Sequence, residues 1–159
     1  MTTATTYDFR LHALPTDVLA DVRAHDVDAA GLPVEHLVAG GGEPLRCCLR
    51  DAQEGEQLIL FAHTLDLPDG PYRETGPVFA HADSCAGPAS TSTYPDDWRG
   101  RPQVLRAYDR RGRIHPGTTM HDGTDPEAAI DAVLAEPGVV RVHSRNVLYG
   151  CYMFTVTRD

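Results

Sequence analysis

Two histidines lie within segments that are otherwise apolar and strand-like. His81 lies in "GPVFAHADSC" (76–85), and His143 lies in "VVRVHSR" (139–145). Imidazole titrates near neutral pH, so a pair of imidazoles can supply a general base and a general acid. We therefore predict that His81 and His143 are catalytic and exchange a proton.

Four polar side chains are candidates for binding an anionic substrate. We predict that Arg106 and Arg145 hold a carboxylate, because the planar guanidinium fork matches that group. Asn146 would orient the substrate or stabilise an oxyanion, and Glu74 would orient an imidazole tautomer. The predicted ligand is therefore a small anionic molecule.

Each of these residues also has a purely structural interpretation. Strand alternation places Arg141, His143 and Arg145 on one face, and an antiparallel sheet often leaves one face exposed to solvent. His81 can be a packed core histidine, and Glu74 can be an exposed loop acid. The sequence leaves these alternatives open.

A zinc site is the second chemical interpretation. The spacing H-x3-C joins His81 to Cys85, and zinc prefers imidazole and thiolate ligands. Further candidate ligands lie elsewhere in the chain: Cys48, His143 and Cys151. However, no C-x2-C pair is present, and Cys47 and Cys48 are expected to alternate between the faces of a strand. We therefore expect no metal and no other cofactor.

A cysteine nucleophile is the third interpretation. In the expected strand 45–50, Cys48 shares a face with Arg46 and Arg50, and nearby cations lower the pKa of a thiol. Cys47 shares its face with leucines, so we predict that it is a small buried apolar side chain.

The elements that must position these residues are mostly strands. Period-2 patterns and turn signals predict strands at 45–50, 57–63, 77–82, 103–109, 113–120, 139–145 and 151–158. In the last of these, Tyr152, Phe154 and Val156 should form one apolar side. Helices are predicted at 15–25 and from a capping Asp125 to Pro137-Gly138.

This pattern predicts an α+β fold with two helices and a mainly antiparallel sheet. We expect the sheet to be strongly curved or a partly closed barrel. At 159 residues the chain fits one domain, covering 1–159. The unpaired edges of an open sheet would also permit a homodimer.

Composition narrows the class of function. The formal net charge is -9, and all 14 basic residues are arginines. An acidic chain is a poor partner for nucleic acid or for an anionic membrane surface, so we expect neither. The N-terminal stretch "MTTATTYDFR" has no signal-peptide pattern, and we expect a cytoplasmic protein.

Several motifs together resemble a bacterial family classified as a domain of unknown function. They are "RCCLRDAQEGEQLILFAH", "YRETGPVFAHADSC", "LRAYDRRGRI" and "VHSRNVLYGCYMFTVTR". The resemblance runs over residues 9–158 and rests most on GPVFAH with its downstream cysteine and on H-x-R-N with its downstream G-C-Y. It implies one cytoplasmic domain of the family's fold, and it implies no particular reaction.

These observations lead to three hypotheses about function. The first is a metal-independent enzyme that uses histidine acid–base chemistry on a small carboxylate-bearing metabolite. The alternative is a non-catalytic module that binds a small molecule or a protein. The second alternative is a zinc- or thiol-dependent enzyme whose site contains His81, Cys85, His143 and Cys151.

Overall fold

The computed structural model describes residues 6–159, and its strands form two five-stranded sheets. The first sheet has the order β1-β10-β9-β7-β8, and all its neighbouring strands are antiparallel. Its strands are β1 (Phe9–His12), β7 (Gln103–Tyr108), β8 (Thr119–His121), β9 (Arg141–Asn146) and β10 (Tyr152–Arg158).

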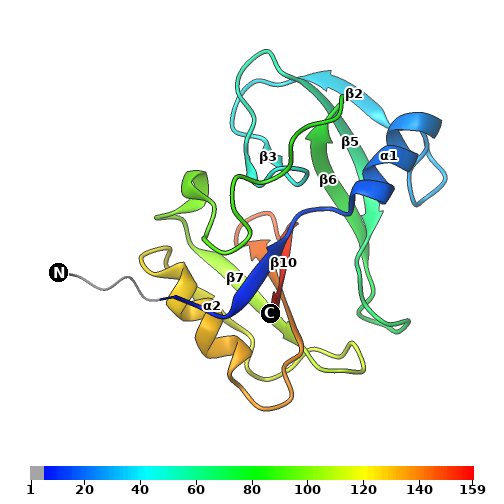
Figure 1. The fold of residues 1–159 in the computed structure, drawn as a ribbon. Helices are drawn as coiled ribbons and strands as arrows, with labels where there is room; N and C mark the ends of the chain where they lie inside the picture. The colour runs from blue at the N-terminus through cyan, green and yellow to red at the C-terminus, as the bar shows by residue number, and fades with distance from the viewer. Residues whose placement is uncertain (1–5) are drawn as a thin grey trace.

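The second sheet has the order β2-β5-β6-β3-β4, with one parallel pair, β3 and β6. Its strands are β2 (Glu35–Val38), β3 (Pro44–Leu45), β4 (Arg50–Asp51), β5 (Gln57–Thr64) and β6 (Thr75–His81). The two sheets occupy different halves of the ribbon, and β10 of the first sheet passes near the second (Figure 1).

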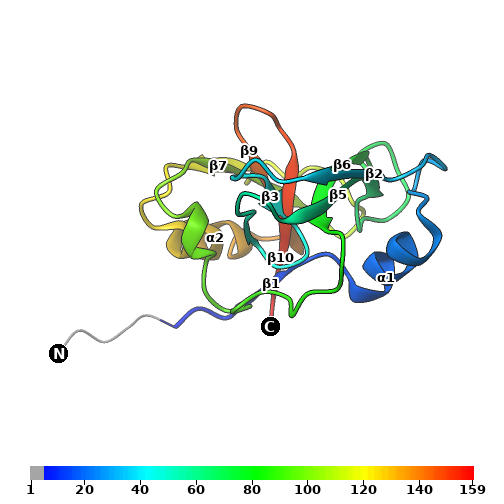
Figure 2. The same cartoon turned by 90° about the horizontal axis from the view of Figure 1, so that it is seen from above.

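Both predicted helices are present. Helix α2 (Pro126–Leu134) begins where Asp125 accepts a hydrogen bond from the backbone N–H of Ala128 at 3.2 Å, as its cap-and-proline signal predicts. Helix α1 (Thr16–His25) follows Pro15. A short 3-10 helix, η1 (Asp96–Trp98), lies in the long connection before β7. Seen from above, α1 and α2 lie on the same side of the strands (Figure 2).

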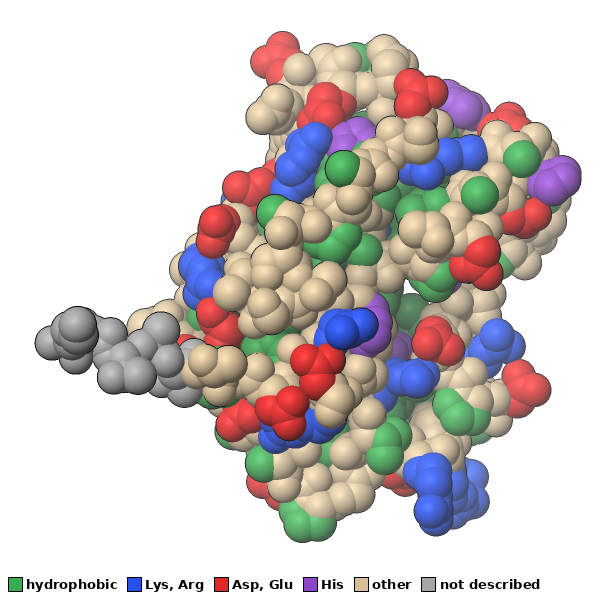
Figure 3. Space-filling model, in the orientation of Figure 1, with side chains coloured by type: hydrophobic (Ala, Val, Ile, Leu, Met, Phe, Trp, Pro, Cys, Tyr) green, Lys and Arg blue, Asp and Glu red, His purple; other side chains and the backbone are tan. Residues whose placement is uncertain are grey.

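The apolar side chains form two cores. The first core lies between the second sheet and α1, and the second core lies between the first sheet and α2. Tyr108 and Tyr152 belong to strands of the first sheet but pack in the first core. Leu49, from the turn between β3 and β4 of the second sheet, packs in the second core. Where the sheets meet, each core therefore contains side chains that belong to the other half of the fold. A hollow with charged and histidine side chains beside it marks this junction on one face (Figure 3).

The α+β prediction is confirmed, but the sheet is not the single curved sheet or barrel that we expected. In the described part of the chain neither sheet closes on itself, and each keeps two edge strands in its order. None of the helices in this part is both long and apolar enough to cross a membrane.

Three local predictions are wrong. Of the predicted strand 113–120, only the end lies in a strand, β8 (Thr119–His121). The stretch 45–50 is not one strand, because β3 ends at Leu45, a turn occupies 46–49, and β4 begins at Arg50. In β10, a register shift lies between Tyr152 and Phe154. The shift turns Tyr152 toward the first core while Phe154 packs in the second, so these two side chains do not share a face.

Candidate metal and thiol site

The turn between β3 and β4 places two adjacent cysteines beside His81. Leu45 pairs in parallel with Phe79 of β6, and the backbone N–H of Arg46 donates to the carbonyl of Phe79 at 2.9 Å. The chain then turns through Cys47 and Cys48. Because this segment is a turn and not an extended strand, the two side chains do not have to point to opposite faces.

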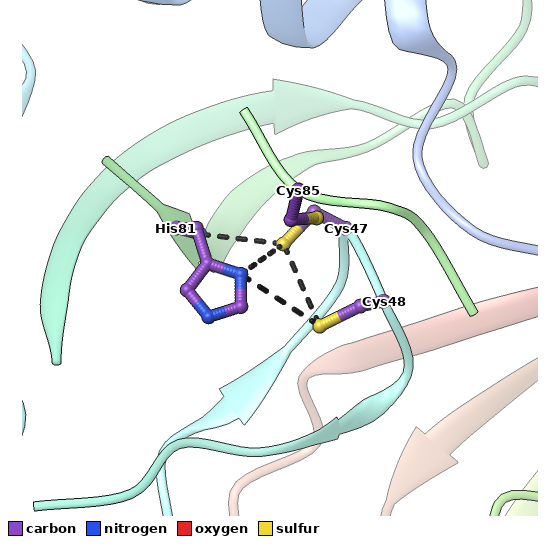
Figure 4. A group of neighbouring side chains, drawn as sticks. All are labelled: Cys47, Cys48, His81 and Cys85. Carbon is purple, nitrogen blue, oxygen red and sulfur yellow. Dashed lines mark hydrogen bonds between the residues drawn. The ribbon is translucent and has the colours of Figure 1, made fainter. Parts of the chain in front are cut away.

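Four ligand atoms from three segments converge here (Figure 4). They are the sulfurs of Cys47, Cys48 and Cys85 and a ring nitrogen of His81, all within 4.8 Å of one another. We call these four residues the thiol–imidazole cluster. The two sulfurs of the turn lie 3.9 Å apart, and Nδ1 of the imidazole lies 3.4 Å from the Cys47 sulfur and 3.8 Å from the Cys48 sulfur.

A carboxylate holds the imidazole from its other side. Oε2 of Glu56 lies 2.8 Å from Nε2 of His81, and Arg50 binds the same carboxylate through two hydrogen bonds of 2.9 Å. Nη2 of Arg50 also lies 3.1 Å from Nε2, but this nitrogen already donates to Glu56. Because the carboxylate only accepts, we assign the proton to Nε2, and the lone pair of Nδ1 then faces the sulfurs. From α1, Arg23 donates twice to the carbonyl of His81 and fixes the end of β6.

The electrostatics favour one thiolate in the turn. The hydrogen bond from the Cys48 thiol, with those from the backbone N–H of His81 and the Cys85 thiol, lowers the pKa of Cys47 to about 5 although burial opposes this shift. The same hydrogen bond and burial raise the pKa of Cys48. The paired Arg50 lowers the pKa of Glu56, which therefore stays ionised beside the imidazole.

A pocket of about 340 Å³ opens beside the thiol–imidazole cluster. Cys48 and Arg50 form part of one wall, and the loop from Gly87 to Ser90 and the segment from Thr93 to Asp97 form the rest. One sulfur of the cluster is therefore next to a space that a small molecule can enter.

The structure separates the two predicted catalytic histidines. His143 lies on β9 in the first sheet, fully buried against the rings of Tyr108 and Tyr152, whereas His81 ends β6 in the second sheet. Neither imidazole has the other as a hydrogen-bond partner. The exposed-face interpretation is also wrong for His143, because this side chain is fully buried against Tyr108 and Tyr152, which pack in the first core.

Three of the predicted substrate-binding residues do come together. Glu74 precedes β6, and its two carboxylate oxygens accept hydrogen bonds of 2.9 Å from Arg106 and Arg145. These arginines belong to β7 and β9, so the three residues join the two sheets. Asn146 lies apart, in a pocket of about 400 Å³ shared with Trp98 and the 147–149 loop.

Only some of the predicted zinc ligands belong to the thiol–imidazole cluster. His81 and Cys85 belong to the thiol–imidazole cluster, but His143 and Cys151 lie on the first sheet or next to it and do not. Arg46, expected beside Cys48, is instead buried and donates to the carbonyls of Pro44 and Tyr152.

Sequence reasoning missed Cys47 as a ligand and Glu56 as the partner of His81. The doublet Cys47-Cys48, together with the H-x3-C spacing, was a signal for Cys47 as a ligand. It was discounted because a strand at 45–50 would place the two cysteines on opposite faces. Glu56 had no signal beyond its place in the turn "EGE", because only the pairing of β5 with β6 brings that turn next to His81.

Comparison with known proteins assigns the chain to a family. Neither the curated proteins nor the solved structures contain a match. A family model described as "Protein of unknown function (DUF1203)" matches residues 42–158, a range that includes the whole thiol–imidazole cluster and the Glu74 ion pairs and starts later than the predicted 9. Because that match spans most of the 159 residues, the chain belongs to the DUF1203 family.

Proposed function

We propose that the thiol–imidazole cluster binds one zinc ion, or a chemically similar soft divalent metal, as a Cys3His centre. Imidazole and thiolate are the ligands that zinc prefers in proteins, and four such ligands complete its usual tetrahedral coordination. The donor set therefore fits this metal better than magnesium or calcium, which prefer oxygen ligands.

The distances within the cluster carry this proposal. With a zinc–sulfur bond of about 2.3 Å and a zinc–nitrogen bond of about 2.0–2.1 Å, two sulfurs of a tetrahedral site lie about 3.8 Å apart, and a sulfur and a nitrogen about 3.5 Å apart. The corresponding distances among Cys47, Cys48 and His81 are 3.9, 3.4 and 3.8 Å. Three edges of the tetrahedron are thus already near their final lengths.

The surroundings of His81 support the same conclusion. A metal-bound histidine usually donates its second ring N–H to a carboxylate, which fixes its tautomer and increases its basicity. Glu56 occupies that position at 2.8 Å, and Arg50 holds Glu56 in place. This arrangement presents the free lone pair of Nδ1 to the sulfurs.

The role of the metal follows from the segments that it would join. Its ligands come from the β3–β4 turn, the end of β6 and the loop after it, so binding would crosslink short segments at one edge of the second sheet. With four protein ligands the coordination is closed, which is typical of zinc sites that stabilise a fold. We therefore assign the metal a stabilising role.

A thiol nucleophile is the second candidate function. The sulfur of Cys47, the imidazole of His81 and the carboxylate of Glu56 form a hydrogen-bonded chain with distances of 3.4 and 2.8 Å. A cysteine, a base and a group that orients the base are the components of nucleophilic catalysis by a thiol. The pocket that Cys48 lines would hold the electrophile, and the Cys47 sulfur lies 3.9 Å behind that of Cys48.

Metal analysis of Cys85→Ser tests the proposal. Zinc per chain would be measured by mass spectrometry in protein expressed with added zinc and purified without chelator. We expect close to one zinc in the native protein and clearly less in Cys85→Ser, together with a lower melting temperature, because one ligand is lost. Cys151→Ser is the matched control, because Cys151 lies outside the cluster, and it should keep its zinc.

One result would contradict this proposal. Native protein with no metal and four reactive thiols would exclude the metal centre. Selective alkylation of Cys47 by iodoacetamide, abolished in His81→Asn, would then support the thiol nucleophile instead.

A further inference from the structure

Buried polar atoms without a partner are concentrated on one side of the first sheet. Seven buried side-chain nitrogen and oxygen atoms of the described residues have no hydrogen-bond partner, and five of them belong to Tyr108, Arg141, His143 and Arg145. The cross-strand pairs Arg106–His143 and Tyr108–Arg141 place these side chains on the same face. Buried polar groups are nearly always paired, so a cluster of exceptions requires a physical explanation.

This face looks toward the second sheet across a pocket. The pocket has a volume of about 290 Å³, and its polar lining includes His63, Glu74, Arg145 and Cys151. Arg145 uses Nε on the carbonyl of Gly150 and Nη2 on Glu74, whereas its buried Nη1 has no partner. A guanidinium in the wall of the pocket therefore retains unused N–H donors.

The charge around the pocket is positive although the whole chain is acidic. Arg145 lines the pocket, and three more arginines are linked to its lining residues. Arg106 shares Glu74 with Arg145, and Arg46 donates to the carbonyl of Tyr152. Arg141 lies on the same face of β9 as Arg145. The four arginines share two carboxylates, Glu74 and Asp66, and the nearest partners of Arg46 are backbone carbonyls. These largely buried arginines outnumber their carboxylate partners, so the pocket favours an anionic ligand.

We propose that the pocket between the two sheets binds a small organic carboxylate, with Arg145 as its principal contact. A guanidinium binds a carboxylate through two parallel hydrogen bonds, and a volume near 300 Å³ is at the lower limit of small-molecule sites. The site is separate from the thiol–imidazole cluster and shares no lining residue with it.

Glu74 has a specific role in this site. Its carboxylate already engages Arg106 and Arg145, so it competes with an incoming carboxylate for the same donors. Because about two-fifths of the Glu74 side chain is exposed (43%), it can move aside when a ligand binds. Neutralising Glu74 should therefore strengthen binding, whereas a purely structural ion pair would give no such gain.

Titration of the full-length protein with acetate, succinate and benzoate tests the proposal. Amide NMR shifts of residues 149–152 would be followed at constant ionic strength, with acetamide as the neutral match and inorganic phosphate as the other anion. We expect saturable shifts with at least one carboxylate. In Arg145→Gln the affinity should fall by about tenfold or more, and in Glu74→Gln it should rise several-fold.

Arg110→Gln is the matched control, because it removes the same charge from an exposed side chain, and it should leave the affinity unchanged. Arg145→Lys keeps the charge without the fork and should bind weakly, which covers the case in which Arg145→Gln fails to fold. The proposal is overturned if no carboxylate gives saturable shifts, if phosphate alone binds, or if Arg145→Lys and Glu74→Gln both bind like the native protein.

Discussion

His143 is an imidazole that its surroundings keep neutral. Burial lowers its pKa to about 3, and the positive charges of nearby arginines act in the same direction. The groups around it come from four strands: Arg106 and Tyr108 from β7, Arg141 and Arg145 from β9, His63 from β5, and Tyr152 from β10. A neutral imidazole suits a site that already contains several cations.

The low pKa of His143 predicts that acid destabilises the protein. Between pH 3 and 6.5 the unfolded state binds a proton at this residue and the folded state does not. Stability from this group is therefore fully present above about pH 6.5 and falls by at most about 1.4 kcal/mol per pH unit toward pH 3. Urea unfolding from pH 4 to 8 would measure this slope.

In His143→Phe the titrating group is replaced by a ring that can pack against Tyr108 and Tyr152. The pH dependence of its unfolding free energy should be shallower than that of the native protein below pH 6.5. If the unfolding free energies of the two proteins instead change with pH in parallel, His143 is protonated in the folded state below pH 6.5, as it is in the unfolded state.

At the scale of single elements, the cap of α2 is the feature with the clearest energetic consequence. Asp125→Ala removes the side chain that accepts from the N–H of Ala128, and such a change typically costs about 1 kcal/mol. Asp8→Ala is the control, since Asp8 is exposed and precedes the first strand. Urea unfolding should separate the two variants; equal midpoints would show that the cap adds nothing.

The elements that the sequence predicts correctly are those whose signals are local. The helix from Pro126 has a cap, a first-turn proline and a spaced apolar stripe, and each acts within one or two turns. The apolar runs of β5 and β6 likewise specify their own strands. By contrast, 45–50 alternates like a strand, yet the chain turns at 46–49, and Leu49 adopts the left-handed conformation at φ 56°.

The candidate site was harder to predict because it depends on that turn. An alternating pattern assigns Cys47 and Cys48 to opposite faces, whereas the turn brings their sulfurs within 3.9 Å. The pairing of Glu74 with Arg106 and Arg145 joins two sheets, and strand order is not encoded in the periodicity of single strands. The sequence could therefore indicate which residues are candidates for a site, but not which of them lie together in the fold.

At the scale of the molecule, polar contacts join the two sheets and their cores. Arg46, from the turn that follows β3 of the second sheet, donates to the carbonyl of Tyr152 in the first sheet at 2.8 Å. The indole N–H of Trp98 donates to Asp51 of β4, while its ring stacks on Phe154 of β10. Together with the Glu74 ion pairs, these contacts predict that neither core unfolds alone.

Paired core substitutions test this cooperativity. Ile59→Val removes one methylene from the first core and Ile130→Val removes one from the second, and each should cost about 0.5–1.5 kcal/mol. Trp98, the single tryptophan, reports on the second core by fluorescence, and circular dichroism reports on both sheets. If the cores unfold together, each variant shifts both urea transitions equally. If they unfold separately, Ile59→Val leaves the Trp98 transition in place and splits the dichroism curve, and the chain is then two cooperative units joined by polar contacts.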